Sequence, residues 1–511
     1  MGCLFGIETE YGLAAAGDTP SYIRNEAVAM GLVADIRKHE PSLDAAGGGI
    51  FVANGSRVYV DAGHLEVATP EVTNPWDVVR YTLAGERLIE QAALRRYGRR
   101  RRSRPLIFKS NVDYAARETW ACHESVLVSG QPDRLVTALT PHLASRVIYS
   151  GAGGLDPMSP GILFTMSPRA HFIRSAEPRQ PRFSMGFAYG KNDPLTCGSY
   201  DRIHLTCGES LCSERAMWLK SATTVLVTAL IDNGVTPGPA VALADPVSAV
   251  RRFASDPGMK ADAELTGVGR TTAIDVQRHY LGRAEAHVGA AFMPAWARPA
   301  CAEWRAVLDQ CEHDPFALQT SLDWCIKRAL FGRILGRRGL DWIAAAELTE
   351  AAARFWCAAG GWPEPAPRLD TERLRDPEFR AHALACGALD VLASCGVTWD
   401  QLVDFLAVRD ELRECDIRFG ELGGRGVFAE LDRAGVLTHR VPGVQPVEPA
   451  VTLPPSSSRA KVRGEAVRQL AGGTARYTCD WAGIASVDAE QWLDLNNPFE
   501  SEARWRPQSA R

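Results

Sequence analysis

The sequence lacks the features of several large protein classes. No uninterrupted apolar segment reaches the ~20 residues that a helix needs to span a bilayer, and no charged and then apolar leader opens the chain. The formal net charge of the 511 residues is only −4, so no overall field draws the protein to nucleic acid or to a membrane surface. We therefore expect a cytoplasmic protein that binds neither nucleic acid nor membrane.

Common metal and catalytic motifs are also missing. The 13 cysteines are scattered from Cys3 to Cys479 without the paired spacing of a zinc finger, which favours reduced thiols that serve as small buried side chains. The sequence contains no GxSxG, HExxH or kinase motif set. The glycine-rich segment SGAGG at 150–154 lacks Walker spacing and is a weak phosphate loop.

One local charge pattern departs from this balance. The run RRYGRRRRSR at 95–104 contains no acidic residue. It could contact nucleic acid or an acidic partner, but a solvated loop after a helix is the simpler interpretation.

Composition and patterning predict an α+β fold. Hydrophobic residues make up 46% of the chain and charged residues 23%, which is typical of a globular protein with a large core. The first half is rich in strand patterns, and the chain from about 214 to 440 is mostly helical, so we expect a mainly antiparallel sheet covered by helices on one face. A Pro- and Ser-rich linker at 441–459 is predicted to separate a large domain (1–440) from a small C-terminal domain (460–511).

Several elements have clear local signals. Asn54-Gly55 predicts a hairpin between two strands. Asn74 and Pro75 predict the start of a helix, and Ser213 predicts the N-cap of a long helix at about 214–233. The segment GILFTMSPRAHFI, 161–173, has the pattern of a further strand.

The segment GIETEYG places two carboxylates on one side of the first strand. Because side chains alternate along a strand, Glu8 and Glu10 point to the same face. Two adjacent carboxylates repel each other, and a Mg²⁺ ion would remove that cost. The alternative is a solvated strand face with Lys or Arg partners.

The segment RVYVDAGHLEVATPE, 57–71, adds further polar groups. Tyr59 and Asp61 share one face of a strand, and Glu66 follows a break at Gly63. If this strand pairs with residues 5–11, Glu8, Glu10 and Glu66 meet around a metal, and Asp61 stands beside it as a nucleophile or base. The alternative is an ordinary polar strand end.

Three further segments hold weaker candidates. His123 and Glu124 in WACHES are more often structural. Arg169 in SPRAH could hold a phosphate through two hydrogen bonds or pair with a surface acid. His204 in RIHLTCGES could ligate a metal or lie satisfied in the core.

Taken in order, these segments resemble one family. The blocks GIETEYG, NGSRVYVDAGHLEVATPE, FKSNVD, CHE, SGAGG, SPRAH, RIHLTCGES, SLDWCIKRAL and RGEAVRQL…CDW are similar, along nearly the whole chain, to the family of the Pup ligase and the Pup deamidase (depupylase). This resemblance implies a glutamine-synthetase-like fold, with a curved sheet that holds ATP and Mg²⁺ and a small C-terminal domain at one edge. It also implies that the partner is Pup or a Pup-like small protein and its conjugates, with a small glutamyl or amine substrate as the alternative. We expect a monomer.

The resemblance also assigns roles to residues of this sequence. It implies metal ligands at Glu8, Glu10, Tyr59, Glu66 and His204, and a catalytic aspartate at Asp61. It places Asn111 and Arg169 near the nucleotide phosphates or the reacting carboxylate, and Trp481 near the adenine.

The direction of the reaction is less evident from the sequence. Glu66 follows Asp61 by five residues, as in the deamidase, whereas the short segment 13–49 is similar to the ligase. The region 186–200 departs from the family block, with Lys191 where an arginine is expected. We predict hydrolysis of a glutamyl amide or isopeptide with Asp61 as the nucleophile. The alternatives are an ATP-dependent ligase that works through a glutamyl phosphate, a nucleotide-binding regulator without catalysis, and a scaffold.

Overall fold

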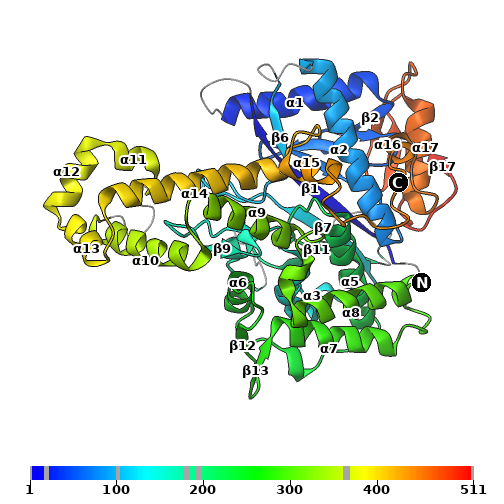
Figure 1. Cartoon of the computed structure of the whole chain (residues 1–511). Helices are drawn as coiled ribbons and strands as arrows, with labels where there is room; N and C mark the ends of the chain where they lie inside the picture. Colours follow the sequence, from blue (N-terminus) through cyan, green and yellow to red (C-terminus); the bar gives the residue numbers. More distant parts are fainter. Residues whose placement is uncertain are drawn as a thin grey trace.

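The computed structural model describes residues 3–15, 22–98, 104–176, 185–191, 198, 200–360, 369–488 and 490–507. These residues fold around one large curved sheet with helices packed on it (Figure 1). Residues 99–103 of the arginine run and residues 192–197 and 199 of the divergent block lie outside the described residues.

Within the described residues, the main sheet has 13 strands. Twelve follow in the order β10 (Ala188–Gly190), β11 (Asp201–Leu205), β7 (Cys122–Val128), β1 (Phe5–Ala14), β5 (His64–Ala68), β4 (Arg57–Asp61), β3 (Ile50–Val52), β2 (Ser42–Ala45), β14 (Tyr477–Cys479), β15 (Gly483–Ser486), β16 (Gln491–Asp494) and β17 (Trp505–Pro507), and β6 (Leu106–Phe108) pairs with β1. The pairs are antiparallel except β14 with β2. The predicted mainly antiparallel sheet is confirmed.

The other elements are helices and two small strand pairs. The helices are α1 (Tyr22–His39), α2 (Pro75–Tyr97), α3 (Pro132–Ser145), α4 (Val147–Ser150), α5 (Glu214–Asp232), α6 (Pro246–Ser255), α7 (Ala273–Ala286), α8 (Ala297–His313), α9 (Asp323–Arg337), α10 (Trp342–Ala358), α11 (Thr371–Arg375), α12 (Pro377–Ala385), α13 (Ala388–Ser394), α14 (Trp399–Phe419), α15 (Val427–Arg433), α16 (Glu448–Thr452) and α17 (Ser458–Leu470). The strand pairs are β8 (Gly154–Leu155) with β9 (Phe164–Thr165), and β12 (Asp262–Glu264) with β13 (Arg270–Thr272).

The alternation along β1 separates a core face of the sheet from a polar face. Phe5, Ile7 and Tyr11 are buried, whereas Glu8 and Glu10 point to the other side. Two helices of the core side start as the sequence predicts. The Asn74 side chain accepts a hydrogen bond from the Asp77 amide at the start of α2, and Ser213 caps α5 in the same way. Burial of the apolar face thus leaves the polar face for chemistry.

Helices α10 to α13 form an arm that projects from the body, and the long α14 returns from it (Figure 1). The arm has its own aromatic interior, in which the Phe355 and Trp399 rings lie 5.8 Å apart. Among the described residues, no single helix is long and apolar enough to cross a bilayer; α13 and α14, bent by 84°, meet the length and composition requirements only as a pair.

The C-terminal residues are attached to the main body by the sheet and by α2. β14 pairs with β2, so the strands after residue 476 continue the main sheet. The predicted linker packs along α2, where the Trp76 indole donates to the Pro442 carbonyl and the Tyr81 hydroxyl donates to the Leu453 carbonyl, both at 2.9 Å. The division into 1–440, 441–459 and 460–511 stays a prediction.

The prediction of a strand at 161–173 is wrong over most of this segment. Only Phe164–Thr165 are extended in a ladder, and a 3₁₀ helix follows at Pro168–Phe172. Pro168 has no amide hydrogen to give to a ladder, which ends the strand pattern at that point.

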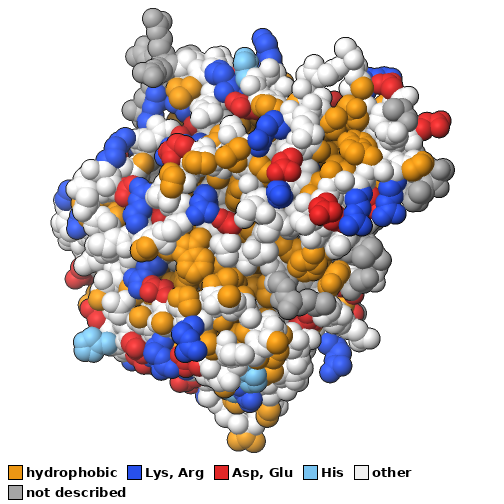
Figure 2. All heavy atoms as spheres, turned by 90° about the vertical axis from the view of Figure 1, so that its right-hand side faces the viewer, with side chains coloured by type: hydrophobic (Ala, Val, Ile, Leu, Met, Phe, Trp, Pro, Cys, Tyr) orange, Lys and Arg blue, Asp and Glu red, His pale blue; other side chains and the backbone are white. Residues whose placement is uncertain are grey.

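Acidic and basic side chains are interspersed on the face that lies to the right in Figure 1 (Figure 2). This face therefore presents no large field of one sign.

Candidate active site

Three neighbouring strands place a row of polar side chains on the open face of the sheet. Glu10 of β1 pairs directly with Glu66 of β5, and Glu66 pairs with Tyr59 of β4. A two-residue turn sets this register, with Ala62 and Gly63 both at positive φ (47° and 84°). The pairing of this segment with the first strand, expected from the sequence, is confirmed.

The carboxylates of this row crowd one another. Glu66 is 5% exposed. Burial, followed by the charges of Glu8, Glu10 and Asp61, raises the pKa of Glu66 to about 10. A carboxyl group in these surroundings holds its proton at neutral pH unless a cation replaces it. Oxygen donors gathered in this way suit a hard divalent ion such as Mg²⁺.

A second group of possible ligands lies one strand away. One donor atom each of Glu8, His123 and His204 lie within 4.8 Å of one another, an arrangement that could hold a metal ion. His123 pairs with Glu8 across β1 and β7, and its Nδ1 is 3.6 Å from Glu8 Oε2. The pKa of Glu8 lies below its usual value, because His123, Lys191 and Arg202 outweigh the effect of burial.

His204 is suited to donate a lone pair. Burial, and then the charges of His123, Arg202 and Lys191, lower the pKa of His204 well below its usual value, so the ring is neutral. Its Nδ1 lies 3.1 Å from Ser125 Oγ, and this contact orients the ring.

His123 is the functional candidate that sequence reasoning undervalued. Its neighbour Glu124 points to the core face, where it forms a buried ion pair with Arg146. The alternation of β7 therefore gives the His-Glu pair two different roles. The alternation in CHESVLV indicates that His123 and Glu124 point to opposite faces. It places His123 beside Glu8 only once the register of β7 with β1 is known.

Glu10 is held by backbone and histidine groups. It accepts a hydrogen bond from the Ala121 amide at 2.8 Å. His123 Nε2 and His64 Nδ1 lie 3.8 and 3.9 Å from its two oxygens. Tyr59 is buried beside this group, and the Arg57 guanidinium lies 4.3 Å above its ring.

Asp61 stands at the end of the β4–β5 hairpin and is exposed. In the part of the chain that the structure describes, no side chain forms an ion pair with it. Its carboxylate shares the face of Tyr59 and is close enough to Glu66 to raise that residue's pKa. Asp61 is therefore accessible beside the carboxylate cluster.

A cavity of about 320 Å³ adjoins Glu8. Its wall combines an aromatic side chain with four basic ones, a pattern that suits a flat base and an anionic group. The residues that carry this pattern are Trp481, Arg57, Lys191, Arg202 and Arg459.

A buried ion cluster fixes one wall of this cavity. Arg459 Nε lies 2.7 Å from Glu71, and Arg463 also pairs with Glu71. Although burial opposes ionisation, the two guanidinium groups lower the pKa of Glu71 to about 2. Arg463 lies 4.6 Å from the Trp481 ring, which meets Phe51 edge-on at 5.0 Å. The C-terminal residues thus hold Trp481 in the wall.

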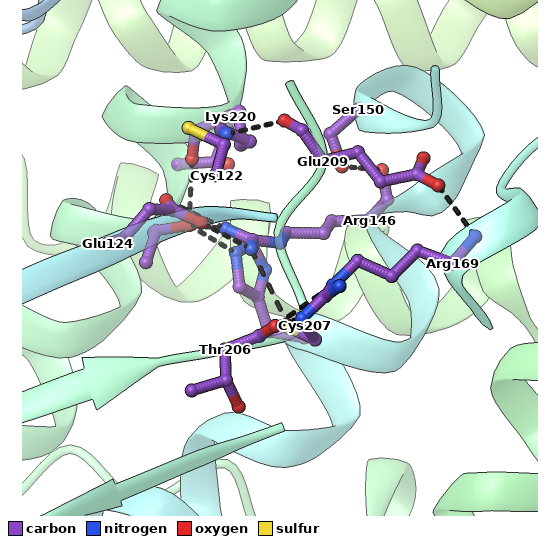
Figure 3. Close-up of polar contacts among 12 residues, drawn as sticks. Cys122, Glu124, Arg146, Ser150, Arg169, Thr206, Cys207, Glu209 and Lys220 are labelled. Atoms are coloured by element: carbon purple, nitrogen blue, oxygen red, sulfur yellow. Dashed lines mark hydrogen bonds and ion pairs between the residues drawn. The ribbon is translucent and has the colours of Figure 1, made fainter. Parts of the chain in front are cut away.

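Asn111 and Arg169 do not line the cavity. The Asn111 side chain donates to the Ser210 carbonyl and accepts from the Ser210 amide, at 2.9 and 2.7 Å. The Arg169 guanidinium donates to the Thr206 carbonyl (Figure 3). It also donates to the Thr119 hydroxyl at 2.9 Å. These contacts hold both side chains against the backbone of the segment 206–210. The expected position of both near the nucleotide phosphates or the reacting carboxylate stays a prediction.

Figure 3 also shows the polar network beneath the sheet. The carboxylate of Glu209 accepts hydrogen bonds from the amides of Ala152 and Arg169. The Ala152 amide, which belongs to the glycine-rich segment 150–154, therefore donates to a buried side chain of the protein. This agrees with the weak phosphate-loop pattern of that segment.

Comparisons with known proteins identify relatives along the whole chain. The chain is 28% identical over 508 residues to Pup–protein ligase 1 of Rhodococcus erythropolis, covering 98% of this chain and 96% of the relative. It is 28% identical over 512 residues to the Pup–protein ligase of Acidimicrobium ferrooxidans, covering 98% and 96%. It is 32% identical over 305 residues to the Pup deamidase/depupylase of Mycobacterium tuberculosis, covering 58% and 60%.

Solved structures show the same fold. The Pup ligase PafA in its complex with Pup matches with a TM-score of 0.74 at 22% identity, over 98% of this chain and 90% of that chain. PafA in complex with ADP matches with a TM-score of 0.66 at 22% identity, over 95% and 93%. The glutamine-synthetase-like fold expected from the resemblance is confirmed.

A family model supports the same assignment from the sequence. The model described as Pup-ligase protein matches residues 3–351 and 396–485, which is most of the chain and leaves out most of the arm. The chain therefore belongs to the Pup-ligase family of enzymes.

Proposed function

We propose that this protein is an ATP- and Mg²⁺-dependent ligase that joins a glutamyl carboxylate of Pup, or of a Pup-like protein, to an amine. One observation carries the proposal. A crowded cluster of carboxylates and histidines adjoins a cavity that is lined by four basic side chains and one tryptophan. The relatives aligned from end to end are named ligases, whereas the deamidase aligns over 58% of the chain. This preference replaces the hydrolase favoured by the sequence alone.

The cavity next to Glu8 suits a nucleotide. Trp481 offers an apolar face for the base, and the guanidinium groups of Arg57, Arg202 and Arg459 can donate to phosphate oxygens. The solved complex of PafA with ADP supports nucleotide binding within this fold.

The donor set fits Mg²⁺. Glu8, Glu10, Tyr59, Glu66 and His204 would hold metal, and His123 joins Glu8 and His204. Bound Mg²⁺ supplies positive charge that stabilises a transferring phosphoryl group. The chain's own part is to keep these carboxylates converged and the His204 ring neutral.

Asp61 is the proposed proton acceptor. Transfer of the γ-phosphoryl group of ATP to the glutamyl carboxylate gives an acyl phosphate and ADP. The amine nitrogen attacks the acyl carbon, phosphate leaves, and Asp61 takes the proton that the amine loses. The exposed position of Asp61 beside Glu66 leaves room for an amine on a protein surface.

Mass spectrometry tests this proposal. The protein is incubated with Mg-ATP, Pup that ends in glutamate, and a lysine-bearing protein, with a lysine-free peptide as the control acceptor. The proposal predicts a product that is heavier by one Pup minus one water. If no conjugate forms with any amine while a Pup isopeptide is cleaved, the ligase assignment is wrong.

One observation favours a second candidate. The two-residue turn between Asp61 and His64 gives the short Asp61–Glu66 spacing that is similar to the deamidase. In that reaction Asp61 attacks the side-chain carbonyl, the amine leaves, and water releases the acyl group. A Pup conjugate with a fluorescent amine tests it: a hydrolase lowers the anisotropy of the dye, and a ligase leaves it unchanged in the absence of ADP and phosphate.

A further inference from the structure

A second and larger cavity lies where the arm meets the body. It measures about 540 Å³ and is lined by residues of two loops, 113–117 and 157–160, together with α10, Leu369 and Asp370, and α14. This junction cavity shares no lining residue with the cavity next to Glu8. Its volume lies within the range of small-molecule sites.

The wall of the junction cavity is mainly apolar. Trp356 and Leu369 come from the arm side, Met158 from a loop of the body, and Ile417 from α14. Trp356 and Leu369 are buried, so they form a fixed floor for an apolar ligand.

Arginines give the cavity a positive end. Arg409 is 1% exposed and donates to the carbonyls of Pro160 and Leu369, at 2.6 and 2.9 Å, which fixes the two sides of the junction. Arg413 lies against the Tyr114 ring, 5.0 Å from its centre, and its side chain is partly exposed. Arg117 also lines the cavity.

The acids of the cavity are already held by backbone amides. Asp113 accepts from the amides of Ala115 and Ala116, at 2.7 and 2.8 Å. Asp370 caps α11 by accepting from the Arg373 amide at 2.7 Å. Asp410, which does not line the cavity, lies 3.0 Å from Arg409 and 3.9 Å from Arg413. Three arginines and two acids line the cavity, so the balance of charge in its wall is positive.

Backbone strain marks the same loop. Arg117 has a φ of 51°, in the left-handed region that residues with a side chain rarely adopt. Such a strained conformation persists where the surrounding structure holds it, and it occurs at binding sites. Here it places an arginine in the cavity wall.

We propose that the junction cavity binds a small organic anion, with an apolar body against Trp356 and Met158 and its charged group at Arg413 and Arg117. Several of the lining residues, including Trp356 and Leu369, lie in the segment 352–395 that the family model leaves unmatched. The two loops and the residues of α14 that complete the wall lie in matched segments. The proposal concerns a cavity separate from the one next to Glu8, so it does not rest on the proposed ligase activity.

The loop that lines the junction cavity continues to the candidate active site. Residues 113–117 lead to Trp120, whose ring lies 6.1 Å from His64, and to Ala121, whose amide is bonded to Glu10. The lining loop is thus continuous along the chain with the residue that holds Glu10, although Trp120 and Ala121 do not line the junction cavity themselves.

Two dyes with the same type of apolar body test the proposal. 8-Anilinonaphthalene-1-sulfonate carries an anionic group, and N-phenyl-1-naphthylamine does not. Binding is measured by fluorescence on the full chain with saturating Mg-ADP, which keeps the other cavity occupied. We expect the anionic dye to bind at least about tenfold more tightly, as for a hydrogen bond to a charged group.

Variants locate the site. Arg413→Gln should weaken the anionic dye about tenfold and leave the neutral dye unchanged. The matched control is Arg375→Gln, which removes an exposed arginine of α11 outside the cavity. Cys357→Phe fills the cavity from an exposed position and should reduce binding of both dyes. Equal affinity for the two dyes, or anionic-dye binding that survives both Arg413→Gln and Cys357→Phe, would overturn the proposal.

Discussion

Glu10 of β1 and Glu66 of β5 are directly paired residues of an antiparallel ladder. Like charges at such positions destabilise a sheet, and Glu8 and Asp61 add two more carboxylates nearby. These carboxylates lie on the polar face of the sheet, opposite the face that packs into the core. We propose that a bound cation offsets the repulsion within this arrangement.

Metal binding should release a proton from Glu66. Because the pKa of Glu66 is raised to about 10, the group is protonated at neutral pH, and a metal must displace that proton. We expect the affinity for Mg²⁺ to rise up to about tenfold per pH unit between pH 6 and 9. Titration calorimetry in two buffers of different ionisation enthalpy measures the released proton. Glu66→Gln should remove this proton release, and an unchanged release would contradict the assignment.

Replacement of Asp61 should separate catalysis from nucleotide binding. Asp61→Asn keeps the size of the side chain but cannot accept a proton, so we expect turnover to fall about 10²- to 10⁴-fold. The affinity for ADP should stay the same, because Asp61 does not line the nucleotide cavity. A variant with full activity would exclude Asp61 as the base. No activity in either the variant or the wild type would favour a nucleotide-binding regulator.

Removal of the Trp481 ring should weaken nucleotide binding. Trp481→Ala takes away the aromatic wall of the cavity, and we expect the Kd for ADP to rise about tenfold. Trp505→Ala is the control, since Trp505 is an exposed tryptophan of β17 that does not line this cavity. Equal effects of the two changes would place the base elsewhere.

Asn111 should matter for stability and not for nucleotide affinity. Asn111→Ala leaves the amide and the carbonyl of Ser210 without their buried partner. We expect the free energy of unfolding to fall by roughly 2 kcal/mol, as measured by urea denaturation, with the Kd for ADP unchanged. A large loss of ADP affinity without loss of stability would restore the phosphate-binding role expected from the resemblance.

The Glu71 ion cluster should make stability depend on pH. The pKa of Glu71 falls from 4.5 to about 2 on folding, so its contribution is present above pH 4.5 and is lost as the pH falls towards 2. At neutral pH this contribution is on the order of 3 kcal/mol. The stability difference between wild type and Glu71→Gln, measured from pH 7 to 3, should be constant above pH 5 and shrink below 4.5. A difference that grows on acidification would contradict this account.

The sequence was sufficient to predict that the carboxylates of the first strands meet on one face. Alternation alone places Glu8 and Glu10 on that face, and the segment 57–71 carries Tyr59 and Asp61 on one strand and Glu66 beyond the break at Gly63. These are local patterns, and the structure preserves them because one face of each strand must be buried.

Other positions depend on contacts that local patterns do not encode. Asn111 lies in a loop and Arg169 in the short 3₁₀ helix Pro168–Phe172. The direction of each side chain follows from its hydrogen-bond partners, and both turn to backbone groups of the segment 206–210. His123 joins the site only through the register of β7 with β1. The junction cavity is formed by segments more than 200 residues apart, so no single stretch of sequence predicts it.

The ratio of ADP released to isopeptide bonds formed tests the central proposal most directly. Wild-type protein is mixed with Mg-ATP, Pup that ends in glutamate and a lysine-bearing acceptor, and both products are counted in the same reaction. A ligase predicts one ADP for each conjugate, and no conjugate when ATP is replaced by ADP. No conjugate under any of these conditions, together with cleavage of a preformed Pup isopeptide without release of ADP, would contradict the ligase and support the hydrolase.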